Sequence, residues 1–406
     1  MNLELNNKNN KGFSGKIIIT GSKSESNRLL ILQKMFNNLI IDNLSNSNDT
    51  KVLRKALTST NMIVNVGHAG TAMRFLTAYY ASVEGVEITI TGSKRMQERP
   101  IKILVDALNH IGADVKYLNK EGFPPLQIKG KEITKSNVTI NGNVSSQYIS
   151  ALLLIAPTLK NGLTISLQGK VTSIPYIKMT LNLLNQIGIT TNWNNDTIQI
   201  FAKNKIDKKT IVVESDWSSA SYYYSLVALS NKSSVELSYF KEKSLQGDKA
   251  LDELFLNFGV KTTFKKDTIL LEKIQNFKQK KHVKLNLVNT PDIAQTIAVT
   301  CVGLNVSCGL EGLHTLKIKE TDRLEALKIE LSKFDAKIRI TNNSIHIKPT
   351  NLNFDKKTTI NTYQDHRMAM AFAPLSLKYP IKILNAEVVN KSYPNFWNDF
   401  KKITNQ

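Results

Sequence analysis

Apolar residues recur with helical spacing in four similar segments, and each segment continues into alternating positions typical of a strand. The segments are 103–117, 181–193, 251–264 and 327–340. A turn residue separates helix from strand in each, and three of the four are glycine, the usual left-handed cap. They are Gly112, Gly188, Gly259 and Asp335, separated by 76, 71 and 76 positions. This near-constant spacing predicts a structural repeat.

The repeat extends toward both ends of the chain. Residues 52–66 form a degenerate upstream copy, and residues 396–403 form a last helix with no strand after it. A strand from residues 1–20 would complete this last unit. Six units divide naturally into two domains of three, so the chain would leave its first domain early and return near residues 211–216. We predict an α/β fold with two domains, in which helices pack on mixed sheets.

The composition and the length of the apolar runs indicate which broad class of protein this is. The longest apolar run near a helix, residues 148–157, is too short to span a bilayer, and the polar first residues lack the apolar core of a signal peptide. The sequence therefore favours a soluble cytoplasmic protein. Its net charge of +21 fits a nucleic acid, an acidic membrane surface or an anionic substrate, or a lysine bias of the whole chain.

Cysteine and histidine give no sign of a metal site. Cys301 and Cys308 lie in an apolar stretch with a spacing unlike CxxC or zinc patterns, and we interpret them as buried thiols. The six histidines form no HExxH or HxH pair. We therefore predict no dedicated metal site.

Cationic residues cluster where helices are predicted to begin. In "GSKSESNRLLIL", Ser22 and Glu25 form a capping box, and Lys23 and Arg28 accompany them on the helix. Cations at a helix N-terminus are unfavourable unless an anion occupies the site. A solvated helix start is the alternative for this stretch alone.

Six further helix starts carry similar residues. They are "GHAGTAMRFL" (67–76), "RMQERP" (95–100), "SSQYISALLL" (145–154), "TSIPYI" (172–177), "KIKETDRLEAL" (317–327) and "YQDHRMAMAF" (363–372). Seven such starts predict a cleft that binds small, highly anionic molecules. Two carboxylates, Asp292 after Pro291 and Glu320 between Lys319 and Arg323, would suit general acid–base chemistry there. An ordinary first-turn acid and a salt bridge are the structural alternatives.

These motifs resemble those of the 5-enolpyruvylshikimate-3-phosphate synthases, in order and spacing along nearly the whole chain, ending at "NKSYPNF". The resemblance implies an inside-out α/β barrel in two domains, the enolpyruvyl transferase fold. It has six βαβαββ repeats, three per domain, and here the first is shortened. The domains would be 21–214, and 1–20 with 215–406, with the active site in the cleft between them.

The resemblance also implies the reaction. The 5-hydroxyl of shikimate 3-phosphate attacks C2 of phosphoenolpyruvate while C3 is protonated, and the tetrahedral intermediate then loses phosphate. The family suggests a monomer that needs no metal or organic cofactor. Phosphoenolpyruvate and shikimate 3-phosphate would be the partners and glyphosate an inhibitor, with no nucleic acid and no membrane.

Site residues follow from motif positions. The implied catalytic residues are Asp292 as base, Glu320 for the methylene proton and Lys23 for the departing phosphate. Shikimate 3-phosphate would be held by Lys23, Ser24, Arg28, Ser145, Ser146, Gln147, Ser173, Tyr176, Asp292, Thr315 and Lys319. Phosphoenolpyruvate would be held by Lys23, Gly70, Arg99, Gln147, Arg323, His366, Arg367 and Lys391.

The chain departs from the family pattern at several positions. His68 replaces a usual Asn, Phe75 a frequent Pro, and Thr315 a common Asn. The chain is also shorter than usual between Leu53 and Gly67, so one repeat is expected to lack a strand.

Two rival functions predict other features. The related transferase that acts on UDP-N-acetylglucosamine usually carries a reactive cysteine in a mobile loop, whereas both cysteines here are in an apolar stretch. A nucleic-acid-binding repeat protein would show basic stripes with exposed aromatics, but aromatic residues make up only 7% of the chain.

Overall fold

The computed structural model describes residues 1–8, 12–143, 145–350 and 357–404, and it divides the chain into two compact units. The inserted unit is Gly21–Val213, and the terminal unit combines Met1–Thr20 with Glu214–Gln406. The second boundary lies one residue before the predicted position. Glu214 belongs to the terminal unit because its carboxylate accepts hydrogen bonds from Trp217 Nε1 and Lys241 N, both at 2.8 Å.

Two repeats of the inserted unit have the full βαβαββ order. The first comprises β4 (Ile63–Asn65), α3 (Gly70–Ala81), β5 (Glu87–Thr91), α5 (Lys102–His110), β6 (Asp114–Tyr117) and β7 (Leu126–Lys129), with the short α4 (Lys94–Gln97) before α5. The second comprises β8 (Asn137–Asn141), α6 (Ser146–Ile155), β9 (Leu163–Gln168), α7 (Ile174–Gln186), β10 (Thr191–Asn194) and β11 (Thr197–Ile200). In each sheet the first two strands run parallel and the other pairings are antiparallel.

The remaining repeat of the inserted unit, which begins first in the chain, is the shortened one. It comprises α1 (Lys23–Met35), β3 (Leu39–Asp42), α2 (Asn48–Thr58) and β12 (Lys209–Val212). Its sheet consists of β3 and β12 in parallel, where the full repeats have four strands. The prediction of a shortened first repeat is therefore confirmed.

The terminal unit holds the other three repeats. The first comprises β2 (Phe13–Ile17), α8 (Trp217–Leu229), β13 (Ser233–Ser238), α9 (Leu251–Leu254), β14 (Val260–Phe264) and β15 (Thr268–Lys273). The next comprises β16 (His282–Asn286), α10 (Ala294–Gly303), β17 (Ser307–Glu311), α11 (Arg323–Ser332), β18 (Ala336–Ile340) and β19 (Ile345–Pro349). The last comprises β20 (Thr358–Ile360), α12 (His366–Phe372), β21 (Ile381–Ile383) and α13 (Phe396–Thr404).

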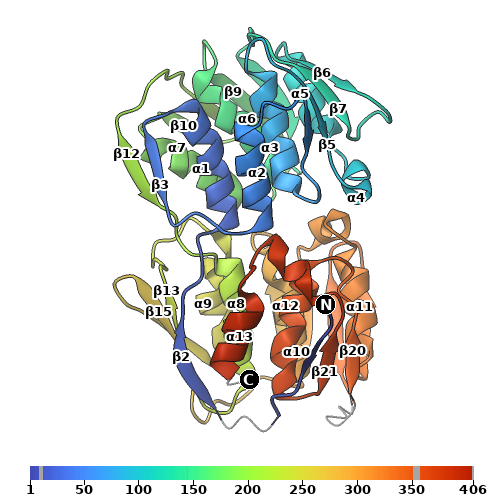
Figure 1. Ribbon diagram of the computed structural model, residues 1–406. Coiled ribbons are helices and arrows are strands. Elements are labelled where there is room, and N and C mark those ends of the chain that lie inside the picture. Colours follow the sequence, from blue (N-terminus) through green and yellow to red (C-terminus); the bar gives the residue numbers. More distant parts are fainter. Residues whose placement is uncertain (9–11, 144, 351–356, 405–406) are drawn as a thin grey trace. The chain divides into compact units, whose positions relative to one another are not determined.

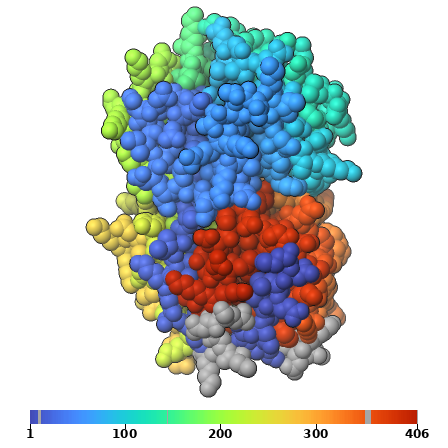
Figure 2. Space-filling view, in the orientation of Figure 1, coloured from blue at the N-terminus to red at the C-terminus, as the bar shows by residue number. Residues whose placement is uncertain are grey.

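The two ends of the chain meet in this last repeat. Strand β1 (Leu3–Leu5) pairs antiparallel with β21, so an N-terminal strand supplies the place that the C-terminal helix leaves open, as predicted. The N-terminal amine also bonds the Glu387 carboxylate at 2.6 Å. In the space-filling view the first residues lie against the red C-terminal segment (Figure 2). The last repeat of the terminal unit is therefore completed by both ends of the chain.

The predicted repeat turns all adopt the left-handed conformation. Gly112, Gly188 and Gly259 have φ of +113°, +82° and +74°, and Asp335 has +57°. Aspartate tolerates this region better than most side chains, which explains why it can stand at the fourth turn. The periodicity in the sequence therefore marks a real structural period.

The core of the terminal unit is built from largely apolar helices that are buried on nearly every side. Helix α10 is buried at every position, and α8 at every position except Ser218. A helix that is apolar all round belongs inside the protein, and Figure 1 shows α8, α10 and α12 beside one another there. The sheets lie outside these helices, so the polar first turns of the helices are the places available for chemistry.

Candidate active site

Arg323 is the centre of a cluster of charges in the terminal unit. It is the first residue of α11 and is 1% exposed. Its Nη1 lies 3.0 Å from Asp292 Oδ1, its Nη2 2.9 Å from Glu320 Oε2, and its Nε 2.7 Å from Asp365 Oδ2. Burial alone would lower the pKa of Arg323, but the three carboxylates outweigh burial and raise it. Arg323 is therefore a permanent cation that draws three carboxylates together.

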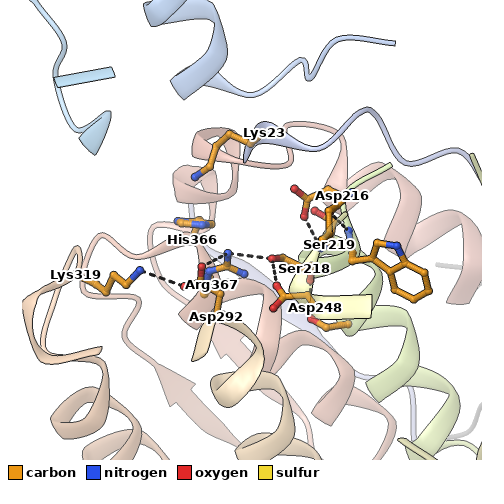
Figure 3. Close-up of polar contacts among 12 residues, drawn as sticks. Lys23, Asp216, Ser218, Ser219, Asp248, Asp292, Lys319, His366 and Arg367 are labelled. Carbon is orange, nitrogen blue, oxygen red and sulfur yellow. Dashed lines mark hydrogen bonds and ion pairs between the residues drawn. The ribbon is translucent and has the colours of Figure 1, made fainter. Parts of the chain in front are cut away.

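Three further cations surround the same carboxylates. Lys319 Nζ lies 3.5 Å from Asp292 Oδ1, and Arg367 Nη2 lies 3.6 Å from Asp292 Oδ2. Lys391 Nζ lies 3.7 Å from Glu320 Oε1. Figure 3 shows Lys319 and Arg367 converging on Asp292. We call these seven residues the charge cluster: Asp292, Lys319, Glu320, Arg323, Asp365, Arg367 and Lys391. It holds four cations and three carboxylates, so it retains positive charge for an anion.

A strained loop positions the start of α12. Tyr363 and Gln364 are consecutive left-handed residues, with φ of 52° and 55°, and neither is glycine. The buried Glu330 carboxylate on α11 accepts a hydrogen bond from the Tyr363 hydroxyl at 2.7 Å. The following residue, Asp365, caps α12. Strain of this kind persists where surrounding contacts enforce it, and it is common at functional sites.

Two more residues that are predicted to bind substrate lie close in sequence to members of the charge cluster. His366 is 1% exposed, and its Nδ1 lies 3.6 Å from Asp365 Oδ1. The Oγ1 atom of Thr315 is buried and has no hydrogen-bond partner among the residues that the structure describes. A buried hydroxyl normally has a partner, so this one is suited to a bound ligand.

In the inserted unit, Arg28 joins three helix starts. Its Nε donates to Thr180 Oγ1 at 2.8 Å and its Nη2 to Ser150 Oγ at 3.0 Å, which connects α1 to α7 and α6. Its Nη1 donates to the Ser24 carbonyl at 2.9 Å, and the guanidinium lies 5.4 Å from the Phe75 ring centroid. Burial lowers the pKa of Arg28 to about 10, so it stays charged at neutral pH.

The predicted residues around Arg28 occupy the same helix starts. Ser145 caps α6 and accepts a hydrogen bond from Gln147 N at 3.4 Å, while Gln147 Nε2 donates to Thr71 Oγ1 at 3.3 Å. Ser146 is the first residue of α6. Ser173 precedes α7 in the left-handed conformation, with φ of 53°. Tyr176 lies in the first turn of α7 and its carbonyl accepts from Arg28 at 3.3 Å.

Lys23 has a partner that the sequence analysis did not identify. Its Nζ donates to Asp49 Oδ2 at 3.1 Å, and the Asp49 side chain is 7% exposed. Asp49 stands in the first turn of α2, where an acidic residue is ordinary. Nothing in the local pattern therefore separated it from other first-turn acids.

Arg99 lies directly against Gly70. A Cβ atom at Gly70 would lie 2.7 Å from Arg99 Nη1, closer than real Cβ atoms come to another atom, and 3.0 Å from Nη2. Arg99 is 9% exposed, and its Nε is buried with no hydrogen-bond partner in the described part of the chain. His68, three positions after Asn65, turns aside to Ser93, with Nδ1 3.0 Å from Ser93 Oγ. Glycine at position 70 is thus required for the present place of Arg99.

Each unit thus brings together its own predicted site residues. Those of the terminal unit are Asp292, Thr315, Lys319, Glu320, Arg323, His366, Arg367 and Lys391. Those of the inserted unit are Lys23, Ser24, Arg28, Gly70, Arg99, Ser145, Ser146, Gln147, Ser173 and Tyr176. Among described residues, no three His, Cys, Asp or Glu side chains are grouped so that they could hold a metal ion. No described helix has the length and apolar character of a membrane span.

Comparisons with known proteins agree with one another. The family model of EPSP synthase (3-phosphoshikimate 1-carboxyvinyltransferase) matches residues 36–400. A 3-phosphoshikimate 1-carboxyvinyltransferase of Bacteroides fragilis is 46% identical, with 95% of this chain and 94% of that protein covered. One of Haemophilus influenzae is 35% identical, with 96% of each covered. A solved EPSP synthase of Acinetobacter baumannii has a TM-score of 0.78 at 19% identity over 99% of this chain and 98% of that one, which shows the same fold.

Proposed function

The chain belongs to the EPSP synthase family, the 3-phosphoshikimate 1-carboxyvinyltransferases, and we propose how its own residues carry out that family's reaction. The protein is a transferase of the shikimate pathway, which supplies aromatic amino acids. It moves the enolpyruvyl group of phosphoenolpyruvate to the 5-hydroxyl of shikimate 3-phosphate and releases phosphate. The charge cluster around Arg323 is the observation that supports the proposed roles below.

Asp292 is the proposed base for the 5-hydroxyl proton. Its ion pairs with Arg323 at 3.0 Å and Lys319 at 3.5 Å require the ionised carboxylate, which is the form that accepts a proton. Glu320, held by the same guanidinium at 2.9 Å, is placed to exchange the proton at the methylene carbon. One rigid cation thus orients both acid–base groups.

Arg323 has little capacity left for a substrate. Its hydrogen bonds to Asp292, Glu320 and Asp365 use four of its five N–H donors. We therefore assign it mainly to holding the carboxylates, with one Nη1–H left for the phosphoenolpyruvate carboxylate. Arg367, Lys391 and Arg99 supply the principal charge for phosphoenolpyruvate, assisted by Gln147 and His366.

Shikimate 3-phosphate is assigned to hydroxyls and cations at the other helix starts. Ser145, Ser146 and Ser173 would hold its phosphate with Lys319, because helix N-termini and hydroxyls suit phosphate oxygens. Ser24, Arg28, Tyr176 and Thr315 would contact the shikimate ring. Lys23 would stabilise the departing phosphate.

Phosphate release tests the reaction directly. The purified protein should release phosphate only when shikimate 3-phosphate and phosphoenolpyruvate are both present. Release from phosphoenolpyruvate alone would indicate a phosphatase instead. Absence of release from a folded protein would overturn the assignment, and UDP-N-acetylglucosamine would then be the next acceptor to test.

The UDP-sugar transferase is the less favoured function. Both cysteines of the chain, Cys301 and Cys308, are at most 1% exposed. Burial also raises the pKa of the Cys301 thiol well above its usual value. Neither thiol is therefore suited to the reactive-cysteine role usual in that enzyme.

Gly70→Ala should raise the KM for phosphoenolpyruvate by roughly 10- to 100-fold, because the added methyl must displace the Arg99 guanidinium. Glyphosate is proposed to compete with phosphoenolpyruvate, so its inhibition constant should rise as well. Steady-state kinetics with each substrate varied in turn provides the measurement. The KM for shikimate 3-phosphate serves as internal control, and an equal rise in both constants would contradict the local role of Gly70.

The proposed assembly is a cytoplasmic monomer without a cofactor. Its basis is the family, whose members are expected to be monomers that need no metal or organic cofactor. Sedimentation of the active protein tests the oligomeric state, and a dimer at assay concentration would correct it.

A further inference from the structure

A partly buried chain of polar contacts leads from Arg367 to Asp248. Arg367 Nη2 donates to Ser218 Oγ at 3.3 Å, and Ser218 Oγ donates to Asp248 Oδ2. Ser218 stands in the first turn of α8, and Asp248 on a 3₁₀ turn, Gly247–Ala250, that is 30 residues further along the chain. Figure 3 shows these contacts, and it shows that Arg367 also approaches Asp292.

The Ser218 hydroxyl group links Asp248 to the orientation of the Arg367 guanidinium. It has one hydrogen and two lone pairs. Because that hydrogen is given to Asp248, the lone pairs of Ser218 are left to face Arg367. One atom of the guanidinium, Arg367 Nη2, then contacts both Ser218 Oγ at 3.3 Å and Asp292 Oδ2 at 3.6 Å. Without the carboxyl group the hydroxyl could rotate and present its hydrogen to the cation.

Asp248 is an unfavourable residue to bury for stability alone. It is 4% exposed, and its hydrogen-bond partner in the described part of the chain is the neutral Ser218. Burial and the charge of Asp292 raise the pKa of Asp248 to about 7, although Arg367 and Ser218 oppose the rise. Asp216 also raises it. A buried carboxyl with such a shift is a candidate for a functional role.

We propose that Asp248 is a positioning residue for phosphoenolpyruvate binding, because through Ser218 it fixes the Arg367 guanidinium in the orientation that receives the anion. This role rests on the proposed function, in which Arg367 binds phosphoenolpyruvate. It adds a residue from a segment, "LQGDKA", that carries no helix-start cation and touches no proposed substrate group directly.

Asp248→Ala should raise the KM for phosphoenolpyruvate roughly tenfold, the effect of weakening one hydrogen bond to a charged group. The KM for shikimate 3-phosphate should change less than twofold, because Lys319 and the serines are untouched. Asp248→Asn should recover much of the loss, since its amide oxygen still accepts from Ser218. The matched control is Asp252→Ala, which removes a carboxylate that pairs with Lys249 at 2.7 Å in the same segment.

Ser218→Ala makes the test independent of the folding of Asp248→Ala. It should raise the KM for phosphoenolpyruvate by a similar factor, and the double variant should lose no more than either single variant, because both act through one path. An unchanged KM for phosphoenolpyruvate, an equal rise for both substrates, or additive losses would overturn the proposal.

Calorimetric titration with phosphoenolpyruvate separates this proposal from the proposed function. In the absence of shikimate 3-phosphate, so that no transfer can occur, wild-type protein should bind phosphoenolpyruvate about tenfold more tightly than Asp248→Ala. If wild-type protein binds but does not turn over, the reaction assignment fails while the positioning role is still measured. If wild-type and variant bind equally, the positioning role fails whatever the turnover.

Discussion

Asp292→Asn should lower kcat by roughly 10²- to 10⁴-fold, the usual contribution of a positioned general base. The KM for shikimate 3-phosphate should stay within a few-fold of the wild-type value, because asparagine keeps the shape and one accepting oxygen. Arg323 would still be neutralised by Glu320 and Asp365, at 2.9 Å and 2.7 Å. The charge cluster should therefore persist while proton transfer is lost. Steady-state kinetics of phosphate release measures both constants.

Asp365→Asn separates the loss of a base from the loss of a charge beside Arg323. Asp365 contacts the same guanidinium and is 0% exposed, but it has no proposed role in proton transfer. Its variant should lose stability more than turnover. A small external base such as formate should partly restore turnover to Asp292→Gly and not to Asp365→Asn. Full turnover by Asp292→Asn would remove Asp292 from its assignment.

The repeats could be predicted from the sequence because their signals are local. A left-handed turn selects glycine or a tolerant residue at the turn itself, so Gly112, Gly188, Gly259 and Asp335 mark the period directly. The shortened repeat also follows from chain length. Helices such as α8 and α10 carry no such signal, because burial on all sides removes the periodic contrast between faces. The residues against which these two helices pack could therefore not be predicted from the sequence.

The residues of the candidate site also divide into those that the sequence predicts and those that only the folded structure reveals. Asp292 and Glu320 were proposed as candidates because they are carboxylates among helix starts rich in cations, and such helix starts can be recognised in the sequence. Asp49 and Asp248 were not identified, because tertiary folding brings each to its partner, over 26 positions for Asp49 and Lys23 and over 30 for Asp248 and Ser218. A sequence pattern also cannot separate a cation that faces a ligand from one that is enclosed by its own protein. Arg28 shows the difficulty, because its bonds to Thr180, Ser150, Ser24 and Tyr176 leave one N–H donor for its proposed contact with shikimate.

Arg323→Gln should destabilise the terminal unit by about 3–5 kcal/mol, because it removes the cation closest to each of three carboxylates that water reaches poorly. The side chains of Asp292, Glu320 and Asp365 are only 14%, 14% and 0% exposed, so water compensates them poorly. The melting temperature should fall by roughly 6–20 °C at pH 8, as expected for a unit of about 200 residues. Turnover should be lost as well, since both acid–base groups lose their common anchor.

The pH dependence identifies the cause of the Arg323→Gln defect. Without the guanidinium, the carboxylates gain pKa in the folded state, so protonation relieves their repulsion as the pH falls. The difference in melting temperature from wild type should therefore shrink between pH 8 and pH 5. Arg323→Lys should recover only part of the stability, because one ammonium group cannot meet three carboxylates in the geometry of a guanidinium. Arg339→Gln, at an exposed position of the same unit, supplies the control and should melt like wild type. A defect of Arg323→Gln that is equal at both pH values would indicate lost packing around α11 instead of unpaired charge.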